Sequence, residues 1–295
     1  QAQKGRFRWL FADNPLGMHV LTGRIDGTLV AVCGHLPVPL KLQGVAVKVA
    51  YGVDLMVAPE HRRTGIGRQF LQERLNRFDL SLSSGQSEAM AKLYRGENTL
   101  LLGQFQRGLF VRQPDLKGGP KAILRESVAF SLGKIRGSGG QRTKLTLDEA
   151  LQWLAENCPD HPTDAFFRWR FAGPIHQDYK FHQLVARGNR GLLVTRNEDK
   201  LEVMVGLFSD PSHRRDMLGC AARTSSAASI SLLCSGETLT RQLQHQGFLV
   251  RPADASVVAM GRNSSLMKAL DKHPWSSFAD DSDSDLLRLG KPDQD

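Results

Sequence analysis

The stretch that decides the fold is Val53–Leu71, which reads VDLMVAPEHRRTGIGRQFL. It continues a run of β-branched residues that begins at Val45, and such a run is typical of a largely buried strand. Pro59 ends the strand because proline cannot donate a hydrogen bond to a ladder. From Gly65 onward, apolar residues recur at helical spacing. The segment therefore predicts a strand, a short basic loop and a helix in direct succession.

The loop has the pattern Arg62-x-x-Gly65-x-Gly67. Glycines at the start of a helix allow a sharp turn and leave backbone amides unshielded, and such amides form an anion site. Arg63 and Arg68 add positive charge. The pattern has neither the GK[ST] ending of a nucleotide P-loop nor the GxGxxG dinucleotide fingerprint. These features predict a site for a pyrophosphate.

This segment resembles the acyl-CoA-binding motif of the GNAT N-acetyltransferase superfamily. The resemblance rests on the predicted strand, its end at Val57-Ala58-Pro59, and Arg62 with the two glycines. The resemblance implies that the loop amides hold the CoA pyrophosphate. It also implies that the strand separates from its neighbour and binds the pantetheine and thioester through its backbone. The implied CoA-binding residues are Leu55, Met56, Val57, Arg62, Arg63, Thr64, Gly65, Ile66, Gly67 and Arg68.

A second part of the resemblance lies at Ser87-x-x-Met90-x-x-x-Tyr94, where the family usually has Asn-x-x-Ala-x-x-x-Tyr. Ser87 and Met90 depart from that pattern. The resemblance implies that Tyr94 protonates the departing CoA thiolate, which is a general-acid role. The alternative is a tyrosine that only packs at a helix end.

The general base is harder to assign. Asp54 lies on the strand expected to hold the thioester, and it could act directly or through water. Strand alternation predicts Asp54 and Met56 on one face, with Val53, Leu55 and Val57 on the other. A structural carboxylate paired with an arginine is an equal alternative. His35 and His61 are weaker candidates.

The order of elements recurs in the second half. Arg8-Trp9-Leu10-Phe11 resembles Arg168-Trp169-Arg170-Phe171, and Gly173-Pro174 follows the second copy. Each copy precedes a hairpin, whose first strand is predicted at His19–Ile25 in the first half, and then a strand, a helix, a short strand and a helix. The strand after the hairpin is predicted at Val45–Val57 in the first half and at Leu201–Phe208 in the second. An amphipathic helix is predicted at Leu147–Asn157, before the second copy. The pattern predicts a mixed α/β fold of two tandem GNAT-like units, each a mostly antiparallel sheet flanked by helices. The expected units are residues 1–135 and 145–295, with a Gly-rich linker at Gly133–Gly140 and no pyrophosphate loop in the second unit.

Composition agrees with a globular protein, because 41% of the 295 residues are hydrophobic and 23% are charged. The positive charge is concentrated at one end: residues 1–140 contain 20 Lys/Arg against 10 Asp/Glu. A basic half favours an anionic ligand or partner. The four cysteines have no CxxC spacing and predict no metal site. No apolar run approaches the roughly 20 residues of a membrane span, and no export signal is visible, so a cytoplasmic location is expected.

The expected function is a CoA-dependent N-acyltransferase, most simply an acetyltransferase. It would use acetyl-CoA or another acyl-CoA, need no metal, and acylate a small-molecule or peptide amine. One alternative is an acyl or aminoacyl transferase that uses aminoacyl-tRNA, which the basic first half allows. Another is a non-catalytic GNAT-like scaffold that binds CoA or a protein. The sequence does not identify the acceptor, the acyl length or the oligomeric state.

Overall fold

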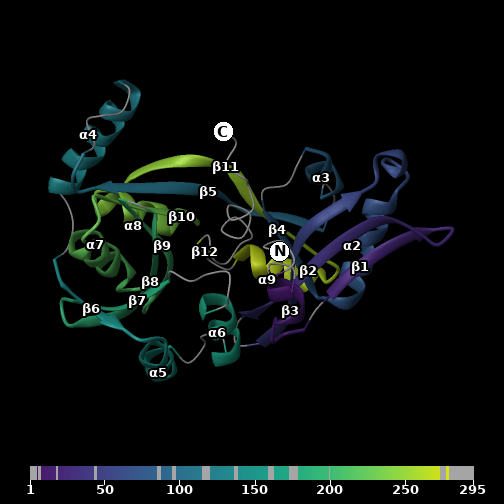
Figure 1. The fold of residues 1–295 in the computed structure, drawn as a ribbon, viewed down its shortest axis with the longest axis horizontal. Helices are drawn as coiled ribbons and strands as arrows, with labels where there is room; N and C mark the ends of the chain where they lie inside the picture. Colours follow the sequence, from purple (N-terminus) through teal and green to yellow (C-terminus); the bar gives the residue numbers. More distant parts are fainter. Residues whose placement is uncertain are drawn as a thin grey trace.

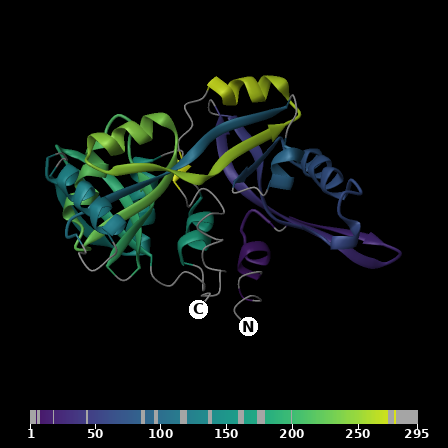
Figure 2. The same ribbon diagram turned by 90° about the horizontal axis from the view of Figure 1, so that it is seen from above.

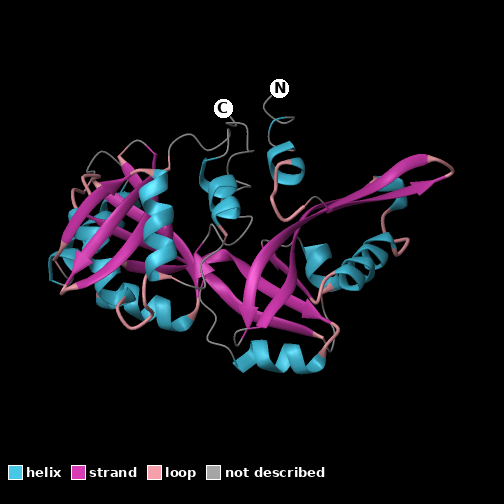
Figure 3. Ribbon diagram, turned by 90° about the horizontal axis from the view of Figure 1, so that it is seen from below, coloured by secondary structure: helices cyan, strands magenta, loops and turns pink. Residues whose placement is uncertain are grey.

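The computed structural model describes residues 5, 8–17, 19–42, 45–84, 88–94, 98–114, 120–135, 139–158, 163–172, 179–198, 200–272 and 277–278. The described strands form one twelve-stranded mixed sheet flanked by helices, which confirms the predicted α/β class (Figures 1 and 3). The first half contains η1 (Arg8–Ala12), β1 (His19–Ile25), β2 (Thr28–Leu42), β3 (Val45–Val57), η2 (Pro59–His61), α2 (Ile66–Arg77), β4 (Leu80–Ser84), α3 (Glu88–Leu93), β5 (Thr99–Val111) and α4 (Pro120–Ile135).

The second half repeats this order of elements. It contains β6 (Gln141–Leu145), α5 (Leu147–Asn157), α6 (Asp164–Ala172), β7 (Lys180–Ala186), β8 (Asn189–Glu198), β9 (Leu201–Phe208), α7 (Arg214–Thr224), β10 (Ser229–Ser235), α8 (Glu237–His245), β11 (Leu249–Gly261), α9 (Ser264–Lys272) and β12 (Ser277–Phe278). The predicted strands at His19–Ile25, Val45–Val57 and Leu201–Phe208 are confirmed.

The predicted amphipathic helix Leu147–Asn157 is also confirmed as α5. Thr146 caps it by accepting the Glu149 N–H, and the Glu149 carboxylate accepts the Thr146 N–H in return, which is a capping box. Its buried face includes Leu151 and Leu154 and packs on the sheet of the second half. The apolar spacing made this helix readable from the sequence, and the capping box fixes where it begins.

The predicted linker Gly133–Gly140 is partly wrong. Helix α4, which was not predicted, continues through Gly133 to Ile135. One glycine costs about 1 kcal/mol in a helix, which does not terminate an element of 16 residues. Residues 136–138 lie outside the described part of the chain.

Strands β5 and β11 connect the two halves (Figure 2). In the first half, β11 lies between β4 and β5, through the pairs Val257–Ser84 and Val257–Gly103. In the second half the order is reversed, and β5 lies between β10 and β11. The sheet of each half is therefore completed by a strand from the other half. The predicted unit boundaries, 1–135 and 145–295, stay a prediction.

Two tryptophans support the predicted repeat. Trp9 lies in η1, the helical segment before the β1–β2 hairpin. Trp169 lies in α6, the helical segment before the β7–β8 hairpin. Their rings stack with centroids 5.1 Å apart. Each indole N–H donates to the other residue's carbonyl, at 2.9 Å from Trp9 and 2.7 Å from Trp169. Both are packing residues in corresponding elements, as predicted, although Gly173-Pro174 lies outside the described residues.

Candidate functional site

The candidate site begins at the loop between β3 and α2, at the right of Figure 1. Gly65 is the N-cap of α2, with φ of 93°, and no side chain caps the helix there. Gln69 makes the first helical hydrogen bond, to the Gly65 carbonyl at 3.1 Å. The N–H groups of Ile66, Gly67 and Arg68 therefore precede the first helical bond and can serve as donors to an anion.

The two glycines of the motif are required for different structural reasons. A Cβ at Gly65 would meet no atom within 4 Å, so the positive φ requires glycine and the space beside it is open. A Cβ at Gly67 would lie 3.0 Å from Leu93 Cδ1, so this glycine allows α2 and α3 to approach each other. Only Gly65 borders open space at the helix start.

The other loop residues stabilise the turn and surround it with charge. The Arg62 Nε donates to the Val57 carbonyl at 3.2 Å, and the Thr64 hydroxyl donates to the His61 carbonyl at 2.7 Å. Arg63 has φ of 68°, a strained value for a residue with a side chain. Arg62, Arg63, Thr64 and Arg68 are all exposed.

The predicted separation of the strand from its neighbour is observed. Strands β3 and β4 run parallel and pair only from Val49–Leu80 to Tyr51–Leu82. Beyond Tyr51, the range 52–57 pairs with β2 on one edge and with no described strand on the other. Its free backbone groups lie directly before the loop.

A β-bulge corrects the predicted alternation along β3. The register shifts between Val32 and Gly34 of β2, opposite Val53 and Met56. Val53 packs in the core that contains Trp9, whereas Leu55 and Val57 pack beside α2 in another cluster. Val53 and Leu55 therefore do not share a face, because the extra residue of a bulge interrupts the two-residue period. Met56 is 62% exposed, and the Asp54 side chain lies outside the described part of the structure.

Tyr94 follows α3 and is 2% exposed. Its hydroxyl oxygen accepts a hydrogen bond from Arg74 Nη1 at 3.0 Å. Sequence reasoning missed Arg74, which is 1% exposed on the inner face of α2. Its spacing from Phe70 was the available signal, because residues four apart share a helix face. Met90 lies in α3, and Ser87 lies outside the described residues.

His35 is fully buried, 3.5 Å from Cys33 Sγ through its Nε2. Burial, assisted by the positive charges of Arg74, His19 and Arg77, lowers the pKa of His35 to about 3. The ring is therefore neutral at physiological pH and a poor proton acceptor. His61 is half-buried in η2.

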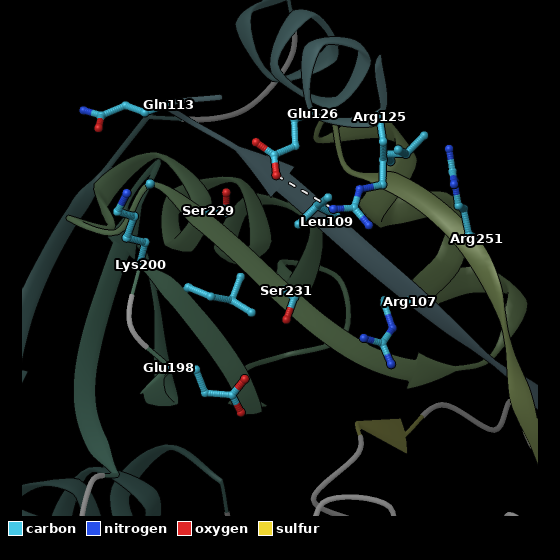
Figure 4. Close-up of a pocket in the computed structure, with 13 residues that line it drawn as sticks. Arg107, Leu109, Gln113, Arg125, Glu126, Glu198, Lys200, Ser229, Ser231 and Arg251 are labelled. Carbon is cyan, nitrogen blue, oxygen red and sulfur yellow. Dashed lines mark ion pairs between the residues drawn. The ribbon is translucent and has the colours of Figure 1, made fainter. Parts of the chain in front are cut away.

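A cavity of about 880 Å³ lies elsewhere, between α4 and the sheet of the second half (Figure 4). Its lining mixes basic and acidic side chains, which are Arg107, Arg125, Lys200 and Arg251 with Glu126 and Glu198, and Arg125 forms an ion pair with Glu126 at 3.8 Å (Figure 4). The residues that line it include none of the predicted site residues.

The described residues offer neither a metal site nor a membrane-spanning helix. They contain no group of three or more His, Cys, Asp or Glu side chains placed to hold a metal ion. No described helix has the length and apolar character to cross a membrane.

Comparison with known proteins matches residues 8–94 to the family described as Acetyltransferase (GNAT) domain. That segment contains the loop, the separated strands and Tyr94. A comparison with curated protein sequences gave no match.

Solved structures share the fold over most of the chain. A probable N-acyltransferase from Enterococcus faecalis has a TM-score of 0.58 at 13% identity, covering 88% of this chain and 65% of that one. A GCN5-related N-acetyltransferase from Anabaena variabilis has a TM-score of 0.55 at 11% identity, with coverages of 87% and 64%. N-myristoyltransferase of Saccharomyces cerevisiae with bound myristoyl-CoA has a TM-score of 0.50 at 13% identity, with coverages of 88% and 71%. The chain thus spans slightly less than two thirds of the first two proteins, and the likeness concerns the fold.

Proposed function

The chain belongs to the GNAT superfamily through its residues 8–94, and from that premise we propose that it is a CoA-dependent N-acyltransferase. It moves an acyl group, most simply acetyl, from acyl-CoA to an amine acceptor. One observation carries the proposal: the uncapped start of α2 lies directly after the free edge of β3. A pyrophosphate and an extended pantetheine arm need these two features next to each other.

Binding uses the backbone more than side chains. The N–H groups of Ile66, Gly67 and Arg68 donate to the pyrophosphate, assisted by the positive end of the α2 dipole. Exposed Arg62 and Arg63 add charge attraction. The free backbone groups of β3 near Leu55 and Met56 pair with the amides of the pantetheine arm, as an added strand would.

The chemistry is a direct displacement. The amine nitrogen attacks the thioester carbon, and a backbone N–H of β3 stabilises the charge that develops on the carbonyl oxygen. Tyr94 then gives its proton to the departing sulfur. Asp54 is the proposed acceptor of the amine proton, because it lies at the bulge of β3.

The acceptor is a small-molecule or peptide amine. The basic first half also fits an aminoacyl-tRNA substrate, which steep loss of binding with salt would reveal. Binding of acetyl-CoA without transfer to any amine would instead support a non-catalytic scaffold.

The test uses two glycine variants with the same backbone strain. Gly65 and Gly27 both have positive φ, 93° and 79°, and a Cβ at either would meet no atom within 4 Å. We expect Gly65→Val to weaken acetyl-CoA binding by at least about tenfold in calorimetry, a loss of about 1.4 kcal/mol. Gly27→Val, in the β1–β2 turn, should lose similar stability and keep the affinity. Equal affinity in the two variants would contradict the assigned site.

A further inference from the structure

Arg74 places a buried positive charge at the point where β3 and β4 separate. It donates from Nη2 to Cys33 Sγ at 3.1 Å, and from Nη1 to Ser81 Oγ at 2.9 Å and to Tyr94 Oη at 3.0 Å. The guanidinium lies against Gly52, where a Cβ would overlap Nη1. Gly52 is the first residue of β3 beyond the last pair with β4. The charge therefore lies behind the opening of the strands.

Burial of the Arg74 guanidinium is energetically unfavourable if the residue serves only to fill space. An arginine stays protonated in proteins, and burial of a charge is unfavourable unless it is paired. Within the described residues, the recorded acceptors of Arg74 are a thiol and two hydroxyls, without a carboxylate. Its Nε is buried with no partner in that same set. One of the acceptors is the Tyr94 hydroxyl, so this buried charge is in direct hydrogen-bond contact with the predicted general acid.

The contact with Tyr94 suggests what that role is. Because Nη1 donates to the Tyr94 oxygen, the hydroxyl proton must be directed away from Arg74. If the oxygen loses its proton, the same N–H stabilises the negative charge that remains, and hydrogen bonds to charged groups are the stronger kind. Within the described residues, the Cys33 Sγ lies 3.1 Å from Arg74 Nη2, and the His35 ring on the same strand lies 3.5 Å from that sulfur.

We propose that Arg74 is a positioning residue that acts through Tyr94 in acyl transfer. The inference rests on the proposed acyltransferase function. The amine nitrogen forms a bond to the thioester carbon, and the C–S bond breaks with its electron pair going to sulfur. The Tyr94 proton moves to that sulfur, and Arg74 holds the charge left on the oxygen. The proton that the amine gives to Asp54 passes to solvent, and solvent returns a proton to Tyr94, so the products are an amide and free CoA thiol.

A double-mutant cycle tests this coupling. The reaction is release of CoA thiol from acetyl-CoA with a library of primary amines, and acetyl-CoA affinity is measured separately. We expect Tyr94→Phe to lower kcat by roughly 10²–10⁴-fold, the usual span for a positioned acid. Arg74→Met should lower kcat when made alone, but by less than about twofold in the Tyr94→Phe background, because residues that act as a unit are not additive. Affinity for acetyl-CoA should change by less than about threefold throughout.

Two further variants separate this role from a structural one. Ser81→Ala removes a different Arg74 hydrogen bond and should leave kcat within about threefold. Arg74→Lys keeps the charge and should recover part of kcat, and it completes the cycle if Arg74→Met fails to fold. Losses that multiply in the double variant, or an equal loss in Ser81→Ala, would overturn the role of Arg74 alone. Acetyl-CoA binding without thiol release by wild type would overturn the proposed function as well.

Discussion

The part of the chain that the structure describes contains two similar strand openings, and of these two the first has the features of an anion site. In the first half, β3 and β4 pair in parallel and separate after Tyr51–Leu82. In the second half, β9 and β10 pair in parallel and separate after Met204–Leu232. In each half, a helix follows the first of the two strands. The same frame is therefore present twice, and the residues placed on it make the difference.

The turns before the two helices differ first. Neither α2 nor α7 has a side-chain cap at its start, but the turn before α2 uses positive φ at Arg63 and Gly65. The turn before α7 contains no residue of positive φ in the range 209–213. There the Asp210 carboxylate accepts hydrogen bonds from the Ser212 hydroxyl and from the Ser212 N–H at 2.8 Å, and these two bonds lower the pKa of Asp210. Helix α7 also has an acidic residue, Asp216, in its first turn, whereas the first turn of α2 has none.

The two openings also differ in whether another strand of the chain occupies the space where the two parallel strands separate. The edge of β3 beyond Tyr51 pairs with no described strand on the β4 side. In the second half, β12 pairs with β10 through Cys234–Phe278 and Ser235–Ser277. Strand β5 pairs with β10 at Cys234 along one edge. Strand β12 therefore pairs with the opposite edge of β10, the edge along which β9 pairs before the two strands separate. A duplicated frame thus has one opening available to a ligand and one filled by its own chain.

Two buried histidines, one in each half, should give the largest measurable effect on stability. Burial lowers the pKa of His35 to about 3 and that of His182 to about 4, from an ordinary 6.5. The unfolded chain therefore binds more protons than the folded one between pH 6.5 and these values, and stability falls as the pH is lowered through that window. Each histidine contributes up to about 1.4 kcal/mol per pH unit.

Chemical denaturation from pH 7 to pH 4 measures this slope. His35→Gln and His182→Gln should each make the curve shallower, and the double variant shallower still. An unchanged slope in both variants would show that neither ring is held neutral by its surroundings.

The tryptophan pair tests how the two halves are joined, with a smaller effect. Trp9→Phe and Trp169→Phe each remove one reciprocal N–H bond and part of the stack. We expect a coupling free energy of about 0.5–1.5 kcal/mol in a double-mutant cycle of unfolding, typical of aromatic pairs. Additive losses would mean that each indole packs independently within its own half.

Sequence reasoning found the elements with strong local patterns. The strand–loop–helix segment at Val53–Leu71 and the capped helix α5 were both readable, because φ preferences, capping and periodicity act over a few residues. The loop residues at 62–68 were predicted for the same reason. Their role in binding CoA stays a prediction.

Features that depend on distant contacts were not readable. The exchange of β5 and β11 joins residues about 150 positions apart, and no local pattern encodes it. The spacing of Arg74 from Phe70 could have placed it on the inner face of the helix, but its contacts with Cys33, Ser81 and Tyr94 come from the tertiary structure. The bulge at β3 was missed because it depends on the register with β2.

The most direct test of the central claim is the number of acetyl-CoA molecules bound per chain, measured by isothermal titration calorimetry. The difference between the openings predicts one site per chain, severely weakened by Gly65→Val and unaffected by Asp210→Ala in the second half. Two sites per chain, or one site that Asp210→Ala disturbs and Gly65→Val does not, would contradict the account.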